Sequence, residues 1–152
     1  MCGCDEAVNV KLAVVEDGKI PVFKTTGAAC ADCYARGTSD FLLTIPSFST
    51  VIVPLGFKME IPEGYYAEIR PRSGLSSKGI NVAIGTIDSD YRGEVGAIVT
   101  NMSVDDFQIH GGDRIAQIMI KKIVKWHGFL VGEDSLSSTE RGNGGFGSTG
   151  SK

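Results

Sequence analysis

The segment from Gly85 to Glu94, with the sequence GTIDSDYRGE, holds the densest group of reactive side chains in this chain. Asp88, Asp90, Tyr91 and Arg92 fall within five consecutive residues, between two glycines. The flanking sequence is rich in β-branched residues, so the spacing predicts a tight hairpin that holds a carboxylate and a ring against a small ligand. Since a carboxylate can orient a water molecule and accept its proton, the segment favours hydrolysis.

Two further segments offer groups that bind phosphate. The first is Pro71-Arg72-Ser73-Gly74, and the second runs from Arg141 to Gly150 with the sequence RGNGGFGSTG. Each supplies an arginine, hydroxyl groups and backbone N–H groups that glycine leaves accessible, which are the donors that a polyphosphate needs. One acidic segment with two phosphate-binding segments predicts the hydrolysis of a nucleotide.

The bulk composition limits the class of protein. A chain of 152 residues forms one domain, and a net charge of −3 provides no basic surface for nucleic acid. No apolar run reaches the ~18 residues that a membrane span requires, and the first six residues lack the features of a signal peptide. We therefore expect a single domain over 1–152 and a soluble, intracellular, cytoplasmic protein that binds neither nucleic acid nor membrane; a nuclear or viral-host setting stays open.

Alternation of apolar and polar residues dominates the first 130 residues and predicts an all-β fold, either a β-barrel or a jelly roll. Turn sequences at 17–18, 61–64 and 110–113 separate the strands. Only Ser73–Lys78 favours a helical turn, with Ser73 as its N-cap. Strands are expected at 8–14, 40–45, 50–55, 57–61, 67–70, 95–100 and 115–126.

The composition changes near residue 132, which divides the domain into a β core of about 7–132 and a flexible tail of about 133–152. The tail is too polar to form a core, yet it places Arg141, Phe146, Ser148 and Thr149 in a glycine-rich frame. Glycine lets backbone approach phosphate closely, and a single ring can close over a base. The tail is therefore interpreted as a mobile lid that orders on its ligand.

The four cysteines allow two interpretations. Cys2, Cys4, Cys30 and Cys33 could form a four-thiolate zinc site if the N-terminus lay beside residues 30–33. The alternative, which we favour, is a loose N-terminal pair and two small, partly buried thiols.

These segments, with two others, resemble the motifs of the trimeric deoxyuridine triphosphate nucleotidohydrolases (dUTPases). Five motifs occur in order, and they cover nearly the whole chain: 27–35, 71–76, 85–94, 112–118 and 141–150. The resemblance implies a distorted antiparallel jelly roll of the β-clip type. It also implies a homotrimer with a mobile C-terminal tail and with active sites shared between subunits.

The resemblance further implies hydrolysis of dUTP to dUMP and diphosphate, with Asp88 activating a water molecule that attacks the α-phosphorus. The product would supply thymidylate synthesis, and the reaction would keep uracil out of DNA. Mg²⁺ is implied as the cofactor, with Asp32 contacting it indirectly, through water. Asp90 would support the hairpin, and Arg114 would either hold Asp32 in place or form an ion pair that is only structural.

The same resemblance assigns the substrate contacts. Tyr91 would pack beneath the deoxyribose and exclude a 2′-hydroxyl, and Phe146 would stack on uracil. The hairpin backbone at Gly85, Thr86 and Ile87, with Gly96 nearby, would read the base. The triphosphate would be bound by Arg72, Ser73, Gly74, Gln117, Arg141, Gly147, Ser148 and Thr149.

Two alternatives remain. A dCTP deaminase has the same fold and a similar arginine-serine motif, but it acts at C4 of cytosine. A trimeric regulatory protein would instead use nucleotide occupancy of the tail to control a partner protein.

Overall fold

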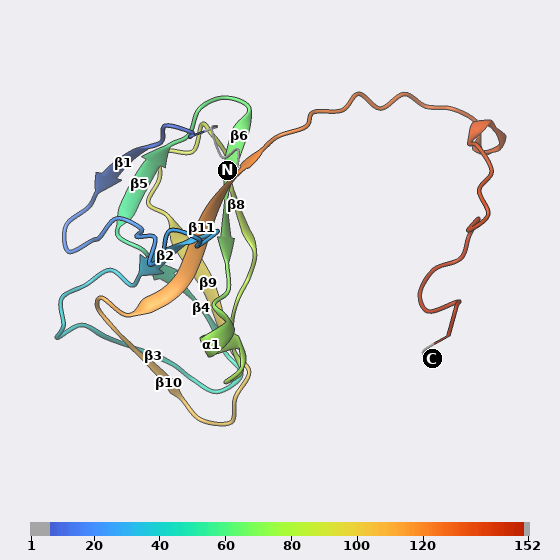
Figure 1. Ribbon diagram of the computed structural model, residues 1–152. Coiled ribbons are helices and arrows are strands. Elements are labelled where there is room, and N and C mark those ends of the chain that lie inside the picture. The colour runs from blue at the N-terminus through green and yellow to red at the C-terminus, as the bar shows by residue number, and fades with distance from the viewer. Residues whose placement is uncertain (1–6, 151–152) are drawn as a thin grey trace.

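The computed structural model describes residues 7–150, which form short antiparallel strands around a core, followed by a long extended tail (Figure 1). The helical elements are α1 (Ser73–Ser76) and the 3₁₀ turn η1 (Glu133–Ser135). The strands of the described residues are β1 (Lys11–Val14), β2 (Ala31–Tyr34), β3 (Leu42–Ile45), β4 (Thr50–Pro54), β5 (Phe57–Glu60), β6 (Tyr65–Arg70), β7 (Ile80–Val82), β8 (Gly85–Ile87), β9 (Gly96–Asn101), β10 (Phe107–His110) and β11 (Arg114–Lys122).

The strands pair into four small sheets, and each pairing is antiparallel. The largest sheet has the order β2-β11-β6-β8, and a second has the order β4-β9-β7. β1 pairs with β5, and β10 pairs with β3. Strands far apart in the sequence therefore lie side by side, which brings residues 31–34 next to residues 114–118.

The period-2 pattern places one face of several strands in the core, but β1, which covers only Lys11–Val14 of the strand expected at 8–14, has all four residues exposed. In β5, Phe57 and Met59 are buried while Lys58 and Glu60 are exposed, and in β6 Ala67 and Ile69 are buried. Burial of a large apolar side chain contributes roughly 1.5–3 kcal/mol. The largest side chains that are fully buried include Phe57, Ile45, Leu55 and Ile109.

The all-β, antiparallel prediction is confirmed, as are the three turns. Asp17 adopts a positive φ of 58°, and Gly64 and Gly112 adopt φ values of 88° and 86°. The sequence did not indicate β2, β7, β8 or β10, because strands of three or four residues give too short an alternation to recognise. The predicted strand at 115–126 begins at Arg114 and ends at Lys122.

The predicted cap of the helical turn is wrong. The N-cap of α1 is Arg72, and no side chain caps it. Ser73 is already the first helical residue, because the extended backbone that an N-cap requires is adopted by Arg72, with φ −98° and ψ 132°.

The segment 85–94 differs from the tight hairpin that was predicted. β8 pairs with β6, whereas β9 pairs with β4 and β7, so the strands on either side of the loop belong to different sheets. The two arms pair only at their base, where β7 meets β9 and Ala83 N donates to Ile98 O at 2.9 Å. The two arms separate above this base because all three residues of β8 pair with β6 instead of with β9.

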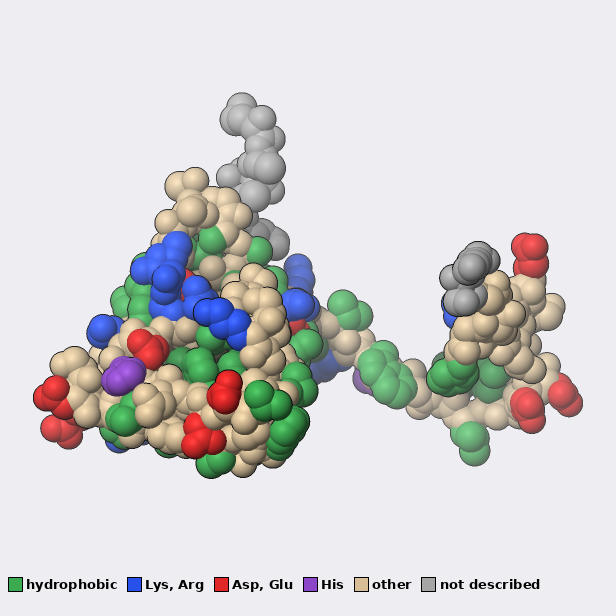
Figure 2. All heavy atoms as spheres, turned by 90° about the horizontal axis from the view of Figure 1, so that it is seen from below, with side chains coloured by type: hydrophobic (Ala, Val, Ile, Leu, Met, Phe, Trp, Pro, Cys, Tyr) green, Lys and Arg blue, Asp and Glu red, His purple; other side chains and the backbone are tan. Residues whose placement is uncertain are grey.

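The chain leaves the β core at the end of β11. Residues after Lys122 run away from the strands in Figure 1, and Figure 2 shows green apolar side chains along the free segment between the body and the tail. Val124, Trp126, Phe129 and Leu130 are each more than 80 % exposed. We call residues 123–131 the apolar arm. No helix within residues 7–150 is long and apolar enough to cross a membrane.

Candidate active site

Asp88 follows the last residue of β8 and is exposed at the start of a turn. The turn closes when Tyr91 N donates to the Asp88 carbonyl at 3.1 Å. Arg92 Nη1 donates to the carbonyl of Ser89 at 2.7 Å, so this arginine braces the loop. The backbone of Asp88 is therefore held in place, and its side chain is exposed to solvent. A group that orients water needs both properties.

β8 presents free backbone beside Asp88. It is the edge strand of its sheet, and β6 pairs with only one of its sides. The Ile87 side chain is buried and the Thr86 side chain is exposed. An edge strand offers unpaired N–H and C=O groups in a fixed row, which suits recognition of a base edge. Gly96 lies in β9, where an added Cβ would meet Ile52 Cγ2 at 3.0 Å.

The Tyr91 ring lies over Gly93. A Cβ built on Gly93 would be 2.3 Å from the Tyr91 hydroxyl oxygen, so only glycine leaves room for the ring. The hydroxyl donates to the Glu94 carbonyl at 3.0 Å. Tyr91 is nonetheless 45 % exposed, so the ring retains an open face.

A second group of predicted residues assembles around Asp32. Arg72 Nε lies 3.3 Å from Oδ1 of Asp32, and Arg114 Nη1 lies 3.3 Å from Oδ2. Arg72 Nη1 also donates to the Arg114 carbonyl at 2.9 Å. The Asp32 side chain is 13 % exposed and Arg72 26 %, so the pairs are partly shielded from water. The contact of Arg114 with Asp32 fits both roles considered for Arg114.

Gln117 positions the second motif as well. It pairs with Asp32 and with Arg70 across the sheet, and its Nε2 donates to the Pro71 carbonyl at 2.8 Å. Ser73 and Gly74 follow in α1 and are exposed, and a Cβ on Gly74 would meet nothing within 4 Å. The first, second and fourth motifs therefore form one cationic cluster with accessible backbone at α1.

One chain does not bring Asp88 to this cluster. Asp88 follows Ile87, which pairs with Ala67 near the start of β6. Asp32 pairs with Gln117 of β11, and Gln117 in turn pairs with Arg70 at the other end of β6. The offset along the strands is about 14 Å, and the three strand spacings from β8 to β2 are also about 14 Å. The two aspartates of one chain are thus on the order of 20 Å apart across a flat sheet.

The tail residues lie apart from both groups (Figure 1). Arg141 Nε donates to the Gly144 carbonyl at 2.8 Å, and the residues from Glu140 to Thr149 surround a cavity of about 390 Å³. Phe146 is fully exposed and has a positive φ of 51°, which is rare for an aromatic residue. Gly147, Ser148 and Thr149 follow it, and Ser148 N donates to the Gly145 carbonyl at 3.0 Å.

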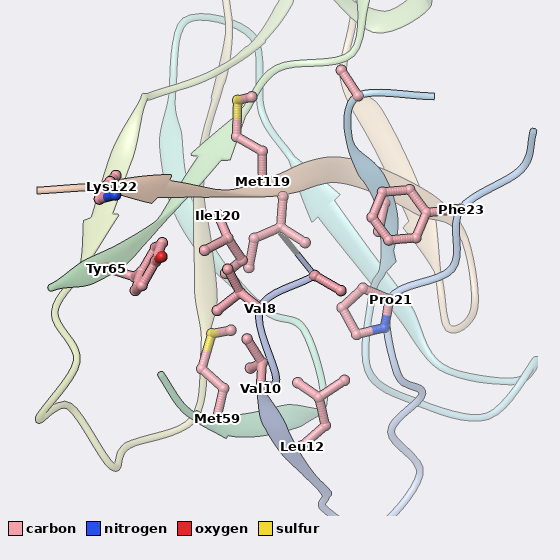
Figure 3. A pocket seen from close by; sticks show the side chains of 14 residues that line it. Val8, Val10, Leu12, Pro21, Phe23, Met59, Tyr65, Met119, Ile120 and Lys122 are labelled. Atoms are coloured by element: carbon pink, nitrogen blue, oxygen red, sulfur yellow. The ribbon is translucent and has the colours of Figure 1, made fainter. Parts of the chain in front are cut away.

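A larger cavity of about 610 Å³ lies elsewhere, between the N-terminal strand and β11 (Figure 3). Its walls are mostly apolar, and they include none of the predicted site residues. A polyphosphate would find no arginine there. We call this cavity the apolar groove, and its lining includes Val8, Val10, Leu12, Phe23, Met59 and Ile120.

The donor groups do not form a protein cage for a metal ion. Within residues 7–150, no cluster of three or more His, Cys, Asp or Glu side chains could hold one. Both oxygens of Asp32 already face arginines. These residues fit Mg²⁺ only as an ion coordinated mainly by substrate phosphates and water, which is its common mode of binding.

The cysteines of the first motif fit the interpretation as small, partly buried thiols. Cys33 is fully buried and Cys30 is partly exposed. Burial, with a smaller effect of Asp32, raises the pKa of Cys33 to about 12; burial also raises the pKa of Cys30. Cys2 and Cys4 lie outside the described residues, so the four-thiolate zinc site stays untested.

Sequence reasoning missed two groups of charged residues. Glu94, at the end of the loop of Asp88, forms an ion pair with Arg36 at 2.9 Å. Glu68, only 8 % exposed, pairs with Arg70 at 3.1 Å and Lys121 at 3.2 Å on the face that also presents Asp32. Glu94 lies at the end of the motif at 85–94, which gives no sign of its partner, whereas the alternation of β6 indicates that Glu68 and Arg70 share a face.

Comparison with known proteins identifies relatives along most of the chain. The family model described as dUTPase matches residues 16–150. A deoxyuridine 5'-triphosphate nucleotidohydrolase of Beijerinckia indica is 45 % identical over 143 residues, which cover 92 % of this chain and 88 % of the relative. One of Roseobacter denitrificans is 47 % identical over 134 residues, 86 % of each chain.

Solved structures have the same fold. A mutant dUTPase of Staphylococcus bacteriophage 80alpha, solved with dUpNHpp, superposes with a TM-score of 0.84 at 23 % identity, over 93 % of this chain and 98 % of that one. A mutant dUTPase from phage phi11 of S. aureus, described with a structural Mg(II) ion, gives a TM-score of 0.73 at 21 % identity, over 86 % and 99 %. Since the family model spans the loop of Asp88, the cluster around Asp32 and the glycine-rich tail, this chain belongs to the dUTPase family.

Proposed function

We propose that this chain hydrolyses dUTP to dUMP and diphosphate, and so supplies dUMP for thymidylate synthesis and keeps uracil out of DNA. The observation that carries the proposal is the position of Asp88: an exposed carboxylate directly after an edge strand whose free backbone can read a base. Membership of the dUTPase family supports the substrate and the reaction.

Asp88 is the proposed catalytic residue. A carboxylate is a weak base, so it contributes mainly by orienting a water molecule towards the α-phosphorus and by accepting part of its proton as the bond forms. The P–O bond to the diphosphate then breaks, and dUMP retains the oxygen of the water. The turn that fixes the Asp88 carbonyl holds the side chain at the end of β8.

Selection of the sugar and base is assigned to the same loop. The open face of the Tyr91 ring would lie against the deoxyribose, where a 2′-hydroxyl would clash. The free edge of β8 at Gly85, Thr86 and Ile87, with Gly96 nearby, would donate to O4 of uracil, where cytosine has an amino group instead. Phe146 of the tail would cover the base.

The triphosphate would be bound by the cationic cluster and by the tail. Arg72 has a planar fork that suits phosphate oxygens, and Ser73 and Gly74 offer accessible backbone beside it. Gln117, Arg141, Gly147, Ser148 and Thr149 complete the proposed contacts, while Asp90 supports the loop. Mg²⁺, when bound, neutralises phosphate charge, and Asp32 would contact its water shell while Arg114 holds Asp32 in place.

Assembly into a homotrimer with shared active sites is proposed on three features. The separation of Asp88 from the Asp32 cluster supports completion of each site by a second chain. The apolar arm exposes Trp126, Phe129 and Leu130, and a monomer would leave this surface in water. The apolar groove offers a complementary surface on another copy. A cyclic assembly satisfies all three requirements at once.

The test is diphosphate release from dUTP, dTTP, dCTP and UTP, each with and without Mg²⁺, with ammonia measured in the dCTP reaction. We expect turnover of dUTP alone, stimulated by Mg²⁺. Release of ammonia from dCTP would instead identify a deaminase, and tight binding of dUTP without turnover would identify a regulatory protein.

A further inference from the structure

The loop that holds Asp88 and Tyr91 is attached to the body of the protein at its C-terminal end, through the backbone of Val95 and through the side chain of Glu94. Glu94, in the last part of that loop, uses both carboxylate oxygens. Oε2 accepts from Arg36 Nη1 at 2.9 Å, and Oε1 accepts from the backbone N–H of Gly56 at 3.1 Å.

Both partners of Glu94 are themselves held by backbone hydrogen bonds. Arg36 N donates to the Pro54 carbonyl at 2.8 Å, and Val15 N donates to the Gly56 carbonyl at 3.1 Å. Gly56 has a positive φ of 78° and packs so closely on Gly18 that a Cβ on Gly18 would lie 1.9 Å from the Gly56 oxygen. Glu94 therefore attaches the loop to a rigid part of the fold.

Tyr91 is linked to the backbone of Glu94 and to that of Asp88. The Tyr91 hydroxyl donates to the carbonyl of Glu94, and Tyr91 N donates to the carbonyl of Asp88. A shift of Glu94 would therefore move two groups together. These are the Tyr91 ring, which is proposed to exclude a 2′-hydroxyl, and Asp88, which is proposed to orient water.

We propose that Glu94 and Arg36 are positioning residues that affect both turnover and sugar selection, because they hold the loop from Asp88 to Tyr91 in place at the end of β8. This inference rests on the proposed hydrolysis of dUTP. Neither residue touches the substrate; each acts through Tyr91 and Asp88. The Glu94 side chain is 25 % exposed and that of Arg36 42 %, so water screens the pair only in part.

The experiment compares kcat and KM for dUTP and UTP in four variants. Glu94→Ala removes both contacts, and Glu94→Gln retains an acceptor for Gly56 N–H but loses the charge. Arg36→Ala removes one contact, and Arg36→Lys restores the charge. Lys11→Ala is the control for the loss of an exposed ion pair, since Lys11 pairs with Glu60 at 2.8 Å between β1 and β5.

For Glu94→Ala we expect kcat for dUTP to fall about tenfold or more, since misplacement of a reacting group by about 1 Å can cost 10²-fold. The KM for dUTP should change little, because the triphosphate is bound by other residues. The preference for dUTP over UTP should fall by about tenfold as the ring loosens. Glu94→Gln and Arg36→Ala should show smaller losses of the same kind, and Arg36→Lys and Lys11→Ala should resemble the wild type.

Combining Glu94→Ala with Arg36→Ala should cost no more than Glu94→Ala alone, because the two residues act through one contact. Thermal melting of each variant shows whether it is folded, and Glu94→Gln keeps the test valid if Glu94→Ala unfolds. If the folded variants retain the wild-type kcat, or lose kcat without any change in the dUTP to UTP ratio, the inference is overturned. A wild-type enzyme that fails to hydrolyse dUTP would refute the proposed function itself, which is a different result.

Discussion

At the scale of single residues, two acidic side chains that are close in the sequence have different surroundings in the fold. Asp88 and Asp90 are two residues apart and both exposed, yet only Asp88 adjoins the free edge of β8. Position relative to the strand, more than residue type, therefore distinguishes the two acids.

The substitution Asp88→Asn tests this distinction. An amide can accept a hydrogen bond but cannot take a proton from water, so we expect dUTP binding to persist while kcat falls by about 10³-fold or more. Asp90→Asn is the matched control and should stay within about tenfold of wild type. Binding is measured by calorimetry and kcat by diphosphate release. Similar losses in both variants would remove the special role of Asp88.

The thiols of the first motif give a pH-dependent prediction. Only a thiolate reacts with iodoacetamide, and burial raises the pKa of Cys33 to about 12 from its ordinary value of 9.0. At pH 8 Cys33 should therefore stay unlabelled in the folded protein, and Cys30, whose pKa is also raised, should react more slowly than a free thiol. Labelling of Cys30 should increase as the pH rises towards 10.

Peptide mapping by mass spectrometry reads out each cysteine separately, and labelling in urea serves as the control for accessibility. Rapid modification of Cys33 in the folded protein at pH 8 would contradict its burial in the core.

At the scale of elements, the sequence predicted the class of fold, the three turns and the segments of the site, because long alternations and glycine-rich turns are local signals. It did not predict that β8 leaves β9 to pair with β6, since a pairing partner is decided by contacts between distant residues. For the same reason the Arg36–Glu94 pair, between residues 58 positions apart, gave no local signal. The ion pair of Asp32 with Arg114 could be proposed only from the resemblance.

The tail is the element whose role is most directly testable. Deletion of residues 141–152 removes Arg141, Phe146 and the hydroxyls that would close over the triphosphate, yet it leaves the strands and the apolar arm intact. We expect the oligomer to persist and kcat/KM for dUTP to fall by about 10²-fold or more, since lid residues assemble the closed site.

Deletion of residues 151–152 alone is the control and should leave turnover unchanged. Light scattering and diphosphate release provide the two measurements. Full activity of the longer deletion would refute the lid, and dissociation of the oligomer would assign the tail to assembly instead.

At the scale of the whole molecule, the groups assigned to the site lie far apart within one chain. The loop of Asp88 and the cluster around Asp32 lie at opposite corners of the β2-β11-β6-β8 sheet, and the tail extends away from both (Figure 1). The spacing of the motifs along the chain does not reveal this separation, and only the resemblance implied sites shared between subunits. This separation supports the proposal that neighbouring copies supply the missing groups.

Mixed oligomers test that proposal. Asp88→Asn and Arg72→Ala chains should each be inactive, but trimers formed from an equal mixture should regain activity. If each site takes Asp88 from one chain and Arg72 from another, about one quarter of the sites in random trimers are intact.

The control mixes wild-type chains with chains that have both substitutions. It should also give about one quarter of wild-type activity if the sites are shared, and about one half if they are not. No recovery in the first mixture would place each active site within a single chain.

The proposed role of Asp88 requires that water attacks the α-phosphorus of dUTP. Hydrolysis of dUTP in isotopically labelled water, followed by mass spectrometry of both products, locates the incoming oxygen directly. With Asp88 aiming water at the α-phosphorus, the label appears in dUMP and the diphosphate is unlabelled. Label in the diphosphate would place the attack at the β-phosphorus and contradict the assignment of Asp88.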